Sequence, residues 1–200
     1  MKNEKPKATF VQRAVKEVKE LFVALIIALL ISIPIRVFLV EAYRIPTGSM
    51  RPTLIEGDGI MVNKFLFGAR VPFVDWRLPA VRQPKRGEIV VFIEPVERKK
   101  VYIKRLVALE GETLEIKNGS LYINDQMLED TVFSKNYYYN RGDFGQPGQK
   151  ITVPAGSYFV MGDNSGSSQD SRYWGFLDKK NVLGKALIIW WPPRRIGVLH

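Results

Sequence analysis

The chain contains no cysteine and only one histidine among its 200 residues. The lack of thiols excludes cysteine nucleophiles, disulfide bonds, cysteine-ligated zinc and iron–sulfur clusters. The one histidine, His200, is the last residue, and chain ends fray, so it is a poor position for a catalytic base. A Ser–His–Asp triad and most zinc sites are therefore almost excluded. Any hydrolase chemistry must take its base from Lys, Asp, Glu or Tyr.

The length and overall composition fit one folded domain, alone or with an attachment. Hydrophobic residues make up 46% of the chain, enough to build a sizeable core. The formal net charge is +10. A basic balance of this size is compatible with binding to nucleic acid or to an anionic membrane.

Residues 21–40, LFVALIIALLISIPIRVFLV, form a long apolar run. At a helical rise of 1.5 Å per residue, twenty residues cover about 30 Å, the thickness of a bilayer core. Arg36 lies near the outer end, where it can snorkel. A comparable stretch after the run carries only Arg44 and Arg51, whereas six cations precede it: Lys2, Lys5, Lys7, Arg13, Lys16 and Lys19. The sequence therefore predicts a cytoplasmic tail (1–20), one membrane span (21–40) and an extracytoplasmic domain (41–200).

Two other interpretations of the apolar run are open. A buried core helix is rarely apolar around its whole circumference. A cleaved secretion signal is the stronger alternative, because residues 40–42 loosely fit a small-x-small cleavage site. The length of the run and its interruption by Arg36 favour a retained span.

The remainder of the chain has the pattern of a mostly β domain. Short runs rich in Val, Ile, Tyr and Phe alternate with Gly, Pro and Asn. They predict strands at 59–62, 88–93, 101–107, 113–116, 121–123, 157–161 and 186–191. Asn118-Gly119, between two alternating runs, predicts a hairpin turn. Residues 114–150 form a hairpin and loop insertion whose Gly-rich part (136–150) is expected to be mobile. The stretch 65–79 is either an edge of the core or a patch that touches lipid headgroups.

Two residues could form a catalytic pair. Ser49 lies on a Pro- and Gly-shaped turn a few residues beyond the apolar run. Lys104 lies in the predicted strand VYIKRLV, on one face with Tyr102 and Leu106. Apolar neighbours lower a lysine pKa, and only a neutral amine can accept a serine proton. Arg105 is no alternative, because a guanidinium stays charged.

The segment MGDNSGSSQDSRYWG follows an apolar run and is dense in small polar residues. Its hydroxyls could orient an amine, and Asp170 could pair with Arg172. An ordinary polar turn is the plainer interpretation of the same pattern.

Five blocks occur in a fixed order after the apolar run: IPTGSMRPTL, RGEIVVF, VYIKRLVALEGE, GDN with DSRYWGF, and GKALIIWWPP. Together they resemble type I signal peptidases, membrane-anchored Ser–Lys proteases that remove signal peptides from exported precursors. The resemblance covers residues from about 20 to 195. It implies a β-rich Ser–Lys protease domain that needs no metal or organic cofactor.

The resemblance also implies roles for individual residues. Ser49 matches the nucleophile and Lys104 the general base. Thr47 matches an oxyanion-hole hydroxyl that is often a serine, acting together with the Ser49 backbone N–H. Three positions match supporting roles: Ser168, which hydrogen-bonds the lysine, and the structural pair of Asp170 and Arg172. The implied substrate pocket consists of Ile45, Met50, Leu54, Tyr102 and Ile103.

One departure concerns Ser165 and Gly166, which stand where many family members have Arg and Asp. This places a local salt bridge in doubt and leaves the dyad untouched.

The expected cut follows small residues in an A-x-A pattern. The expected partners are signal-peptide-bearing precursors and the lipid bilayer, without nucleic acid. The expected location is a bacterial plasma membrane, or a photosynthetic internal membrane.

Two other functions fit parts of the sequence. Self-cleaving repressors also use a Ser–Lys pair, but they carry a DNA-binding region where this chain has its apolar run. A non-catalytic, membrane-tethered basic protein would bind acidic partners or nucleic acid, and its binding would fall steeply with salt.

Overall fold

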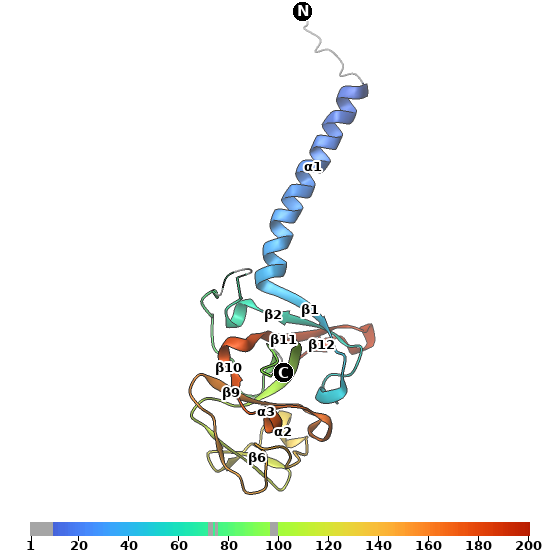
Figure 1. The fold of residues 1–200 in the computed structure, drawn as a ribbon. Coiled ribbons are helices and arrows are strands. Elements are labelled where there is room, and N and C mark those ends of the chain that lie inside the picture. Colours follow the sequence, from blue (N-terminus) through green and yellow to red (C-terminus); the bar gives the residue numbers. More distant parts are fainter. Residues whose placement is uncertain (1–9, 72–73, 75, 97–99) are drawn as a thin grey trace, which may run out of the picture.

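The computed structural model describes residues 10–71, 74, 76–96 and 100–200, which form a long helix attached to a β-rich domain (Figure 1). Helix α1 (Phe10–Pro34) continues into a π-helical turn (Ile35–Leu39). Its stretch Val15–Leu39 is long and apolar enough to cross a membrane, and its most apolar part is not buried in the protein. The predicted span, residues 21–40, is thus confirmed as a candidate. The observed apolar stretch starts earlier, at Val15, and ends at Leu39, because Val40 already belongs to the first strand.

The main sheet has eight strands, all joined by antiparallel pairing. Seven follow one path, in the order β1 (Val40–Arg44), β2 (Gly59–Asn63), β11 (Val182–Trp191), β3 (Ile89–Ile93), β4 (Val101–Ala108), β9 (Ser157–Met161) and β10 (Leu177–Asp178). The eighth, β12 (Gly197–Val198), pairs with β11. Because β1 follows the helix directly, the apolar helix is joined to the edge of the sheet without a linker (Figure 1).

A second sheet of four strands lies in the part of the chain predicted as an insertion. Its order is β7 (Gln126–Met127), β6 (Ser120–Ile123), β5 (Thr113–Lys117) and β8 (Ile151–Thr152). The predicted hairpin turn is confirmed: Asn118 and Gly119 have φ angles of 51° and 79°, and β5 pairs with β6 around them. Both residue types tolerate this left-handed conformation. The apolar faces of β5 and β6 pack into one core cluster with Phe133 and Phe159.

The mostly β fold is confirmed, and each predicted strand coincides with an observed one. The prediction missed β1, the first half of β11 and four strands of two residues, β7, β8, β10 and β12. The described helices after β1 are short: α2 (Thr131–Ser134), α3 (Ser171–Trp174) and five single 3₁₀ turns. These turns cover Gly48–Met50, Phe65–Phe67, Ser165–Ser167, Lys179–Asn181 and Pro193–Arg195.

Two sequence interpretations are refined by the burial of their side chains. In the stretch 65–79, Phe67 is buried in the core, whereas Val74 and Trp76 are exposed. The described part of this stretch therefore contributes both to the core and to the surface. The loop 136–150 has no regular structure, yet Tyr138 is buried and Asn140 donates hydrogen bonds to Ile116 and Gly145. Its mobility stays a prediction.

Candidate active site

Ser49 lies on the 3₁₀ turn Gly48–Met50 within the connection between β1 and β2. Reciprocal backbone contacts close the base of this connection, because Ile45 N–H donates to Asp58 O and Gly57 N–H donates to Ile45 O. Met50 is fully buried and packs into the core. The turn is therefore held at its base and on its inner side, which fixes the direction of the Ser49 side chain.

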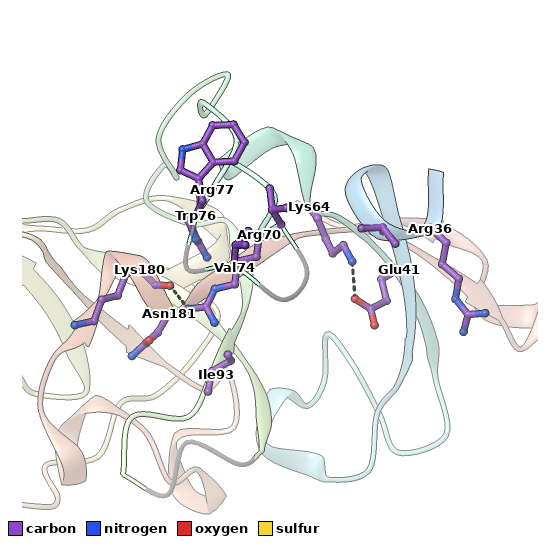
Figure 2. Close-up of a pocket in the computed structure, with 12 residues that line it drawn as sticks. Arg36, Glu41, Lys64, Arg70, Val74, Trp76, Arg77, Ile93, Lys180 and Asn181 are labelled. Atoms are coloured by element: carbon purple, nitrogen blue, oxygen red, sulfur yellow. Dashed lines mark hydrogen bonds and ion pairs between the residues drawn. The ribbon is translucent and has the colours of Figure 1, made fainter. Parts of the chain in front are cut away.

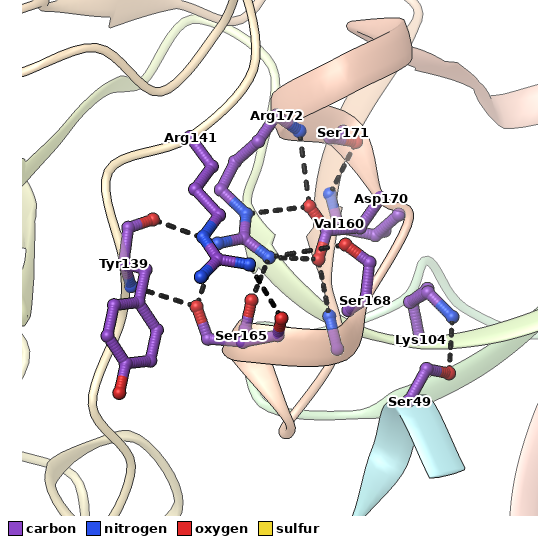
Figure 3. A network of polar contacts seen from close by, with 12 residues as sticks. Ser49, Lys104, Tyr139, Arg141, Val160, Ser165, Ser168, Asp170, Ser171 and Arg172 are labelled. Carbon is purple, nitrogen blue, oxygen red and sulfur yellow. Dashed lines mark hydrogen bonds and ion pairs between the residues drawn. The ribbon is translucent and has the colours of Figure 1, made fainter. Parts of the chain in front are cut away.

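Lys104 projects from β4 toward this turn, and its Nζ lies 2.8 Å from Ser49 Oγ (Figure 3). The same Nζ donates to Ile103 O at 3.0 Å. Lys104 is 4% exposed and Ser49 is 8% exposed. Burial lowers the pKa of Lys104 to about 8, although the nearby carboxylates of Asp170 and Asp163 act in the opposite direction. Desolvation is the larger effect, as the apolar pattern of the strand predicts.

Two buried ion pairs limit the influence of those carboxylates. Arg172 donates Nε and Nη2 to Asp170, both at 2.8 Å, and neither side chain is exposed to solvent. Arg105 donates Nε and Nη2 to Asp163 at 2.8 and 2.7 Å. A carboxylate held in a bidentate pair with a guanidinium exerts a weaker net field on a third group. The pairs thus allow Lys104 to remain partly neutral beside two acids.

The segment after β9 also holds the Ser49 turn from outside. Asn164 donates its backbone N–H to Ser49 O and its side-chain amide to Gly48 O, each at 3.0 Å. Gly162 packs so closely that a Cβ built on it lies 2.3 Å from Ser168 Oγ and 2.4 Å from Ser49 O. A side chain at this position would force the turn away from Lys104.

Ser49 and Lys104 line a cavity of about 570 Å³. One wall is formed by the strand end that precedes Lys104, and another by the polar segment after β9. The lining residues are Pro46, Thr47, Ser49, Lys100, Val101, Tyr102, Ile103, Lys104, Ser167 and Gln169. A buried serine–lysine contact at the side of an open cavity is suited to nucleophilic attack on a bound acyl group.

The family model for signal peptidase, peptidase S26, matches residues 18–191. The chain belongs to this family. It is 37% identical to the signal peptidase I of Pseudomonas aeruginosa, over 86% of this chain and 76% of the relative. It is 35% identical to a probable signal peptidase I-2 of Synechocystis, over 90% of this chain and 76% of the relative. A crystal structure of a signal peptidase I from Enterococcus faecalis is 35% identical and covers 53% of this chain and 98% of that one, with a TM-score of 0.43.

Membership of the signal peptidase family makes the chain an enzyme, a hydrolase of the S26 serine peptidases. This membership argues against the alternative interpretation of the chain as a non-catalytic basic binding protein. Among the residues that the structure describes, no group of three His, Asp or Glu side chains could hold a metal ion.

The five residues expected to line the substrate pocket fall into two groups. Tyr102 and Ile103 line the cavity, as expected. Ile45, Met50 and Leu54 are instead buried in the core, at 3%, 0% and 0% exposure. Their apolar character reflects the packing of the Ser49 turn, which sequence alone does not distinguish from a pocket wall.

Two hydroxyl groups differ in their surroundings. Thr47 is exposed, lines the cavity and makes no capping hydrogen bond with its side chain. Ser168 Oγ is buried without a hydrogen-bond partner in the described structure. The expected hydrogen bond from Ser168 to Lys104 is therefore not formed here.

The departure at Ser165 is accommodated by a different contact. Ser165 Oγ accepts from Arg172 Nη1 at 2.8 Å and from Tyr139 N–H at 2.9 Å. A neutral hydroxyl thus connects the buried guanidinium to the loop 136–150. Arg141, which belongs to the same loop 136–150, donates a hydrogen bond to Gly166 O. The region is held by hydrogen bonds where many relatives are expected to use a salt bridge.

Sequence reasoning missed the roles of Asp163, Asn164 and Arg105. One signal was available, because an arginine inside an apolar strand needs a buried carboxylate partner. The sequence does not say which carboxylate supplies it, since the pair joins residues 58 positions apart.

Proposed function

We propose that this protein is a membrane-bound serine endopeptidase that removes N-terminal signal peptides from exported precursors, with Ser49 as nucleophile and Lys104 as general base. The observation that carries the proposal is the buried contact of 2.8 Å between Lys104 Nζ and Ser49 Oγ beside an open cavity. The names of the family and of its relatives supply the substrate class.

The pKa of Lys104 makes the chemistry feasible near neutral pH. A pKa of about 8 leaves roughly 10% of the amine neutral at pH 7, compared with about 0.03% at its ordinary value of 10.5. The neutral amine takes the Ser49 proton as Oγ attacks the scissile carbonyl. The resulting ammonium donates that proton to the leaving amine. Lys104 is then neutral again and activates water for deacylation.

The developing oxyanion needs hydrogen-bond donors at the mouth of the cavity. We assign this role to the Ser49 backbone N–H and the Thr47 hydroxyl, which is not engaged as a helix cap. Loss of one such donor typically lowers kcat by about 10²-fold or more. We assign to Ser168 the orientation of the Lys104 amine, because its buried hydroxyl has no other described partner. Asp170 and Arg172 support this arrangement as a structural pair.

Specificity for A-x-A sequences follows from the cavity wall. Tyr102 and Ile103 narrow the space next to the dyad, so small side chains are expected on the acyl side of the cut. We place the N-terminal tail in the cytoplasm and the catalytic domain outside, in a bacterial plasma membrane. Enzyme and substrate then share one bilayer, which raises their effective concentration.

The test is cleavage of a precursor that carries an A-x-A signal peptide by the full chain in detergent. The wild-type protein is expected to cut after the second small residue, as N-terminal sequencing of the product reads directly. Ser49→Ala is expected to reduce the rate to background. The matched control is Ser134→Ala, an exposed serine outside this cavity, which is expected to keep the wild-type activity. Cleavage by Ser49→Ala at the wild-type rate and position would refute the assignment of the nucleophile.

A further inference from the structure

A second, larger cavity of about 1150 Å³ lies where the apolar helix meets the domain (Figure 2). Its walls come from the π-helical turn, from β1, from Lys64 just after β2, from described residues between Arg70 and Arg77, from the end of β3 and from the 3₁₀ turn before β11. The residues that matter for its chemistry are Arg36, Glu41, Lys64, Arg70, Trp76 and Arg77. None of them contributes to the dyad or to its cavity.

The charge of this cavity is strongly unbalanced. Its one described carboxylate, Glu41, is already paired with Lys64 at 3.1 Å. Arg36, Arg70 and Arg77 have no carboxylate partner among the described residues. A group of guanidinium ions with no counter-charge among the described residues is the electrostatic signature of an anion site.

The backbone brings two of these arginines together. Arg70 and Arg77 are partners in an isolated antiparallel bridge, flanked by hydrogen bonds from Val71 to Trp76 and from Leu78 to Ala69. Like charges directly opposite each other destabilise a strand pair, so this arrangement is unfavourable without an anion between them. Burial, together with the neighbouring Arg70, lowers the pKa of Arg77.

Each of these two guanidinium groups is also fixed in direction. Arg70 donates one Nη to Lys180 O at 2.5 Å, and Arg77 donates one Nη to Val182 O. These carbonyls neutralise no charge, and they leave the other N–H groups of each planar fork available. Two oriented forks match the tetrahedral oxygens of a phosphate better than flexible ammonium groups do.

The position of the cavity identifies the source of the phosphate. Arg36 lies in the last turn of the candidate membrane span, so the cavity begins where the hydrocarbon of a bilayer would end. Val74 and Trp76 are 58% and 60% exposed on the same stretch of chain. Exposed tryptophan beside arginine is typical of residues that sit among lipid headgroups.

We propose that this cavity binds the phosphodiester headgroup of an anionic phospholipid, with Arg70 and Arg77 as its principal ligands. Zwitterionic lipids are disfavoured because their headgroup cation would face the same arginines. The site goes beyond the proposed peptidase function. Of the earlier proposals, it depends only on the one that the helix crosses a bilayer.

The test is lipid binding to the full chain in neutral detergent, measured by native mass spectrometry with phosphatidylglycerol and, separately, phosphatidylcholine. The wild-type protein is expected to prefer phosphatidylglycerol. In the variant R70Q/R77Q its affinity is expected to fall about 30-fold, roughly fivefold for each cation. The control K135Q/R194Q removes the same charge from exposed positions outside the cavity and is expected to stay within about twofold of wild type.

Further arms separate the possible ligands. Inorganic phosphate in large excess should not displace the lipid, and an acidic peptide should not bind through these arginines. R70K/R77K keeps the charge and loses the forks, so it should bind with intermediate affinity, and it covers the case in which R70Q/R77Q fails to fold. Unchanged cleavage of a soluble peptide by R70Q/R77Q would show that its domain is intact.

Three results would overturn the proposal. The first is equal binding of the two lipids by wild type, and the second is unchanged phosphatidylglycerol binding by R70Q/R77Q. The third is displacement of the lipid by free phosphate or by the acidic peptide, which would make that molecule the ligand.

Discussion

Lys104→Met is expected to lower kcat/KM for a signal-peptide substrate by about 10²–10⁴-fold, the usual contribution of a general base. Methionine has a similar length and no proton acceptor, so Ser49 keeps its place and loses its activation. The measurement is the initial rate of precursor cleavage at a fixed pH. Lys117→Met, at an exposed position of the small sheet, is the matched control and should retain wild-type activity.

Lys104→Met should make the folded protein more stable although it lowers the activity. A lysine with a pKa lowered from 10.5 to about 8 opposes folding, fully below pH 8 and progressively less as the pH rises toward 10.5. Removing this penalty at pH 7 is expected to raise the free energy of unfolding by as much as about 3 kcal/mol. An inactive but stabilised variant identifies a catalytic role. A variant that retains more than about a tenth of the activity would contradict it.

Arg172→Met is expected to destabilise the domain by about 3–5 kcal/mol, because it leaves the Asp170 carboxylate buried without its ion pair. The guanidinium also donates to Ser165 and Tyr139, so the loop 136–150 loses one of its attachments as well. For a domain of this size the loss corresponds to a fall in Tm of roughly 10 °C or more. Thermal unfolding followed by circular dichroism measures it.

Two further variants separate charge burial from packing. Asp170→Asn combined with Arg172→Met removes the unpaired charge and should recover at least about half of the lost stability. Arg141→Met changes an exposed arginine of the same region and should have little effect. If Arg172→Met costs less than about 1 kcal/mol, the buried pair does not support the site.

In Arg172→Met the unpaired Asp170 carboxylate should also raise the pKa of Lys104, which moves the onset of activity to higher pH.

The fold could be predicted largely because its strands are locally marked. The alternation around Asn118-Gly119 and the apolar runs of β3, β4 and β9 carry their own signals. Strands β1 and β12 do not, because VEAYR and GV carry no strong strand pattern of their own and are strands only where they pair with β2 and β11. The end of the apolar helix was also misplaced by one residue, since Val40 suits a helix and a strand edge equally well.

The site was less accessible to sequence reasoning than the fold. The turn around Ser49 and the apolar neighbours of Lys104 made these two residues candidates, and the resemblance to signal peptidases selected them. The structure brings their side chains together. The contacts that hold the turn, from Asn164 and Gly162, depend on how a distant segment packs, and no local pattern encodes that. For the same reason Ile45, Met50 and Leu54 were assigned to the pocket although they form the core beneath the turn.

The central claim is that a neutral Lys104 activates Ser49, and the pH dependence of wild-type kcat/KM tests it most directly. Activity requires the deprotonated amine, so it should fall tenfold for each pH unit below the pKa of Lys104 and level off above a pH of about 8. A profile that is flat from about pH 6 to 9, or that rises only near the ordinary lysine pKa of about 10.4, would contradict the account.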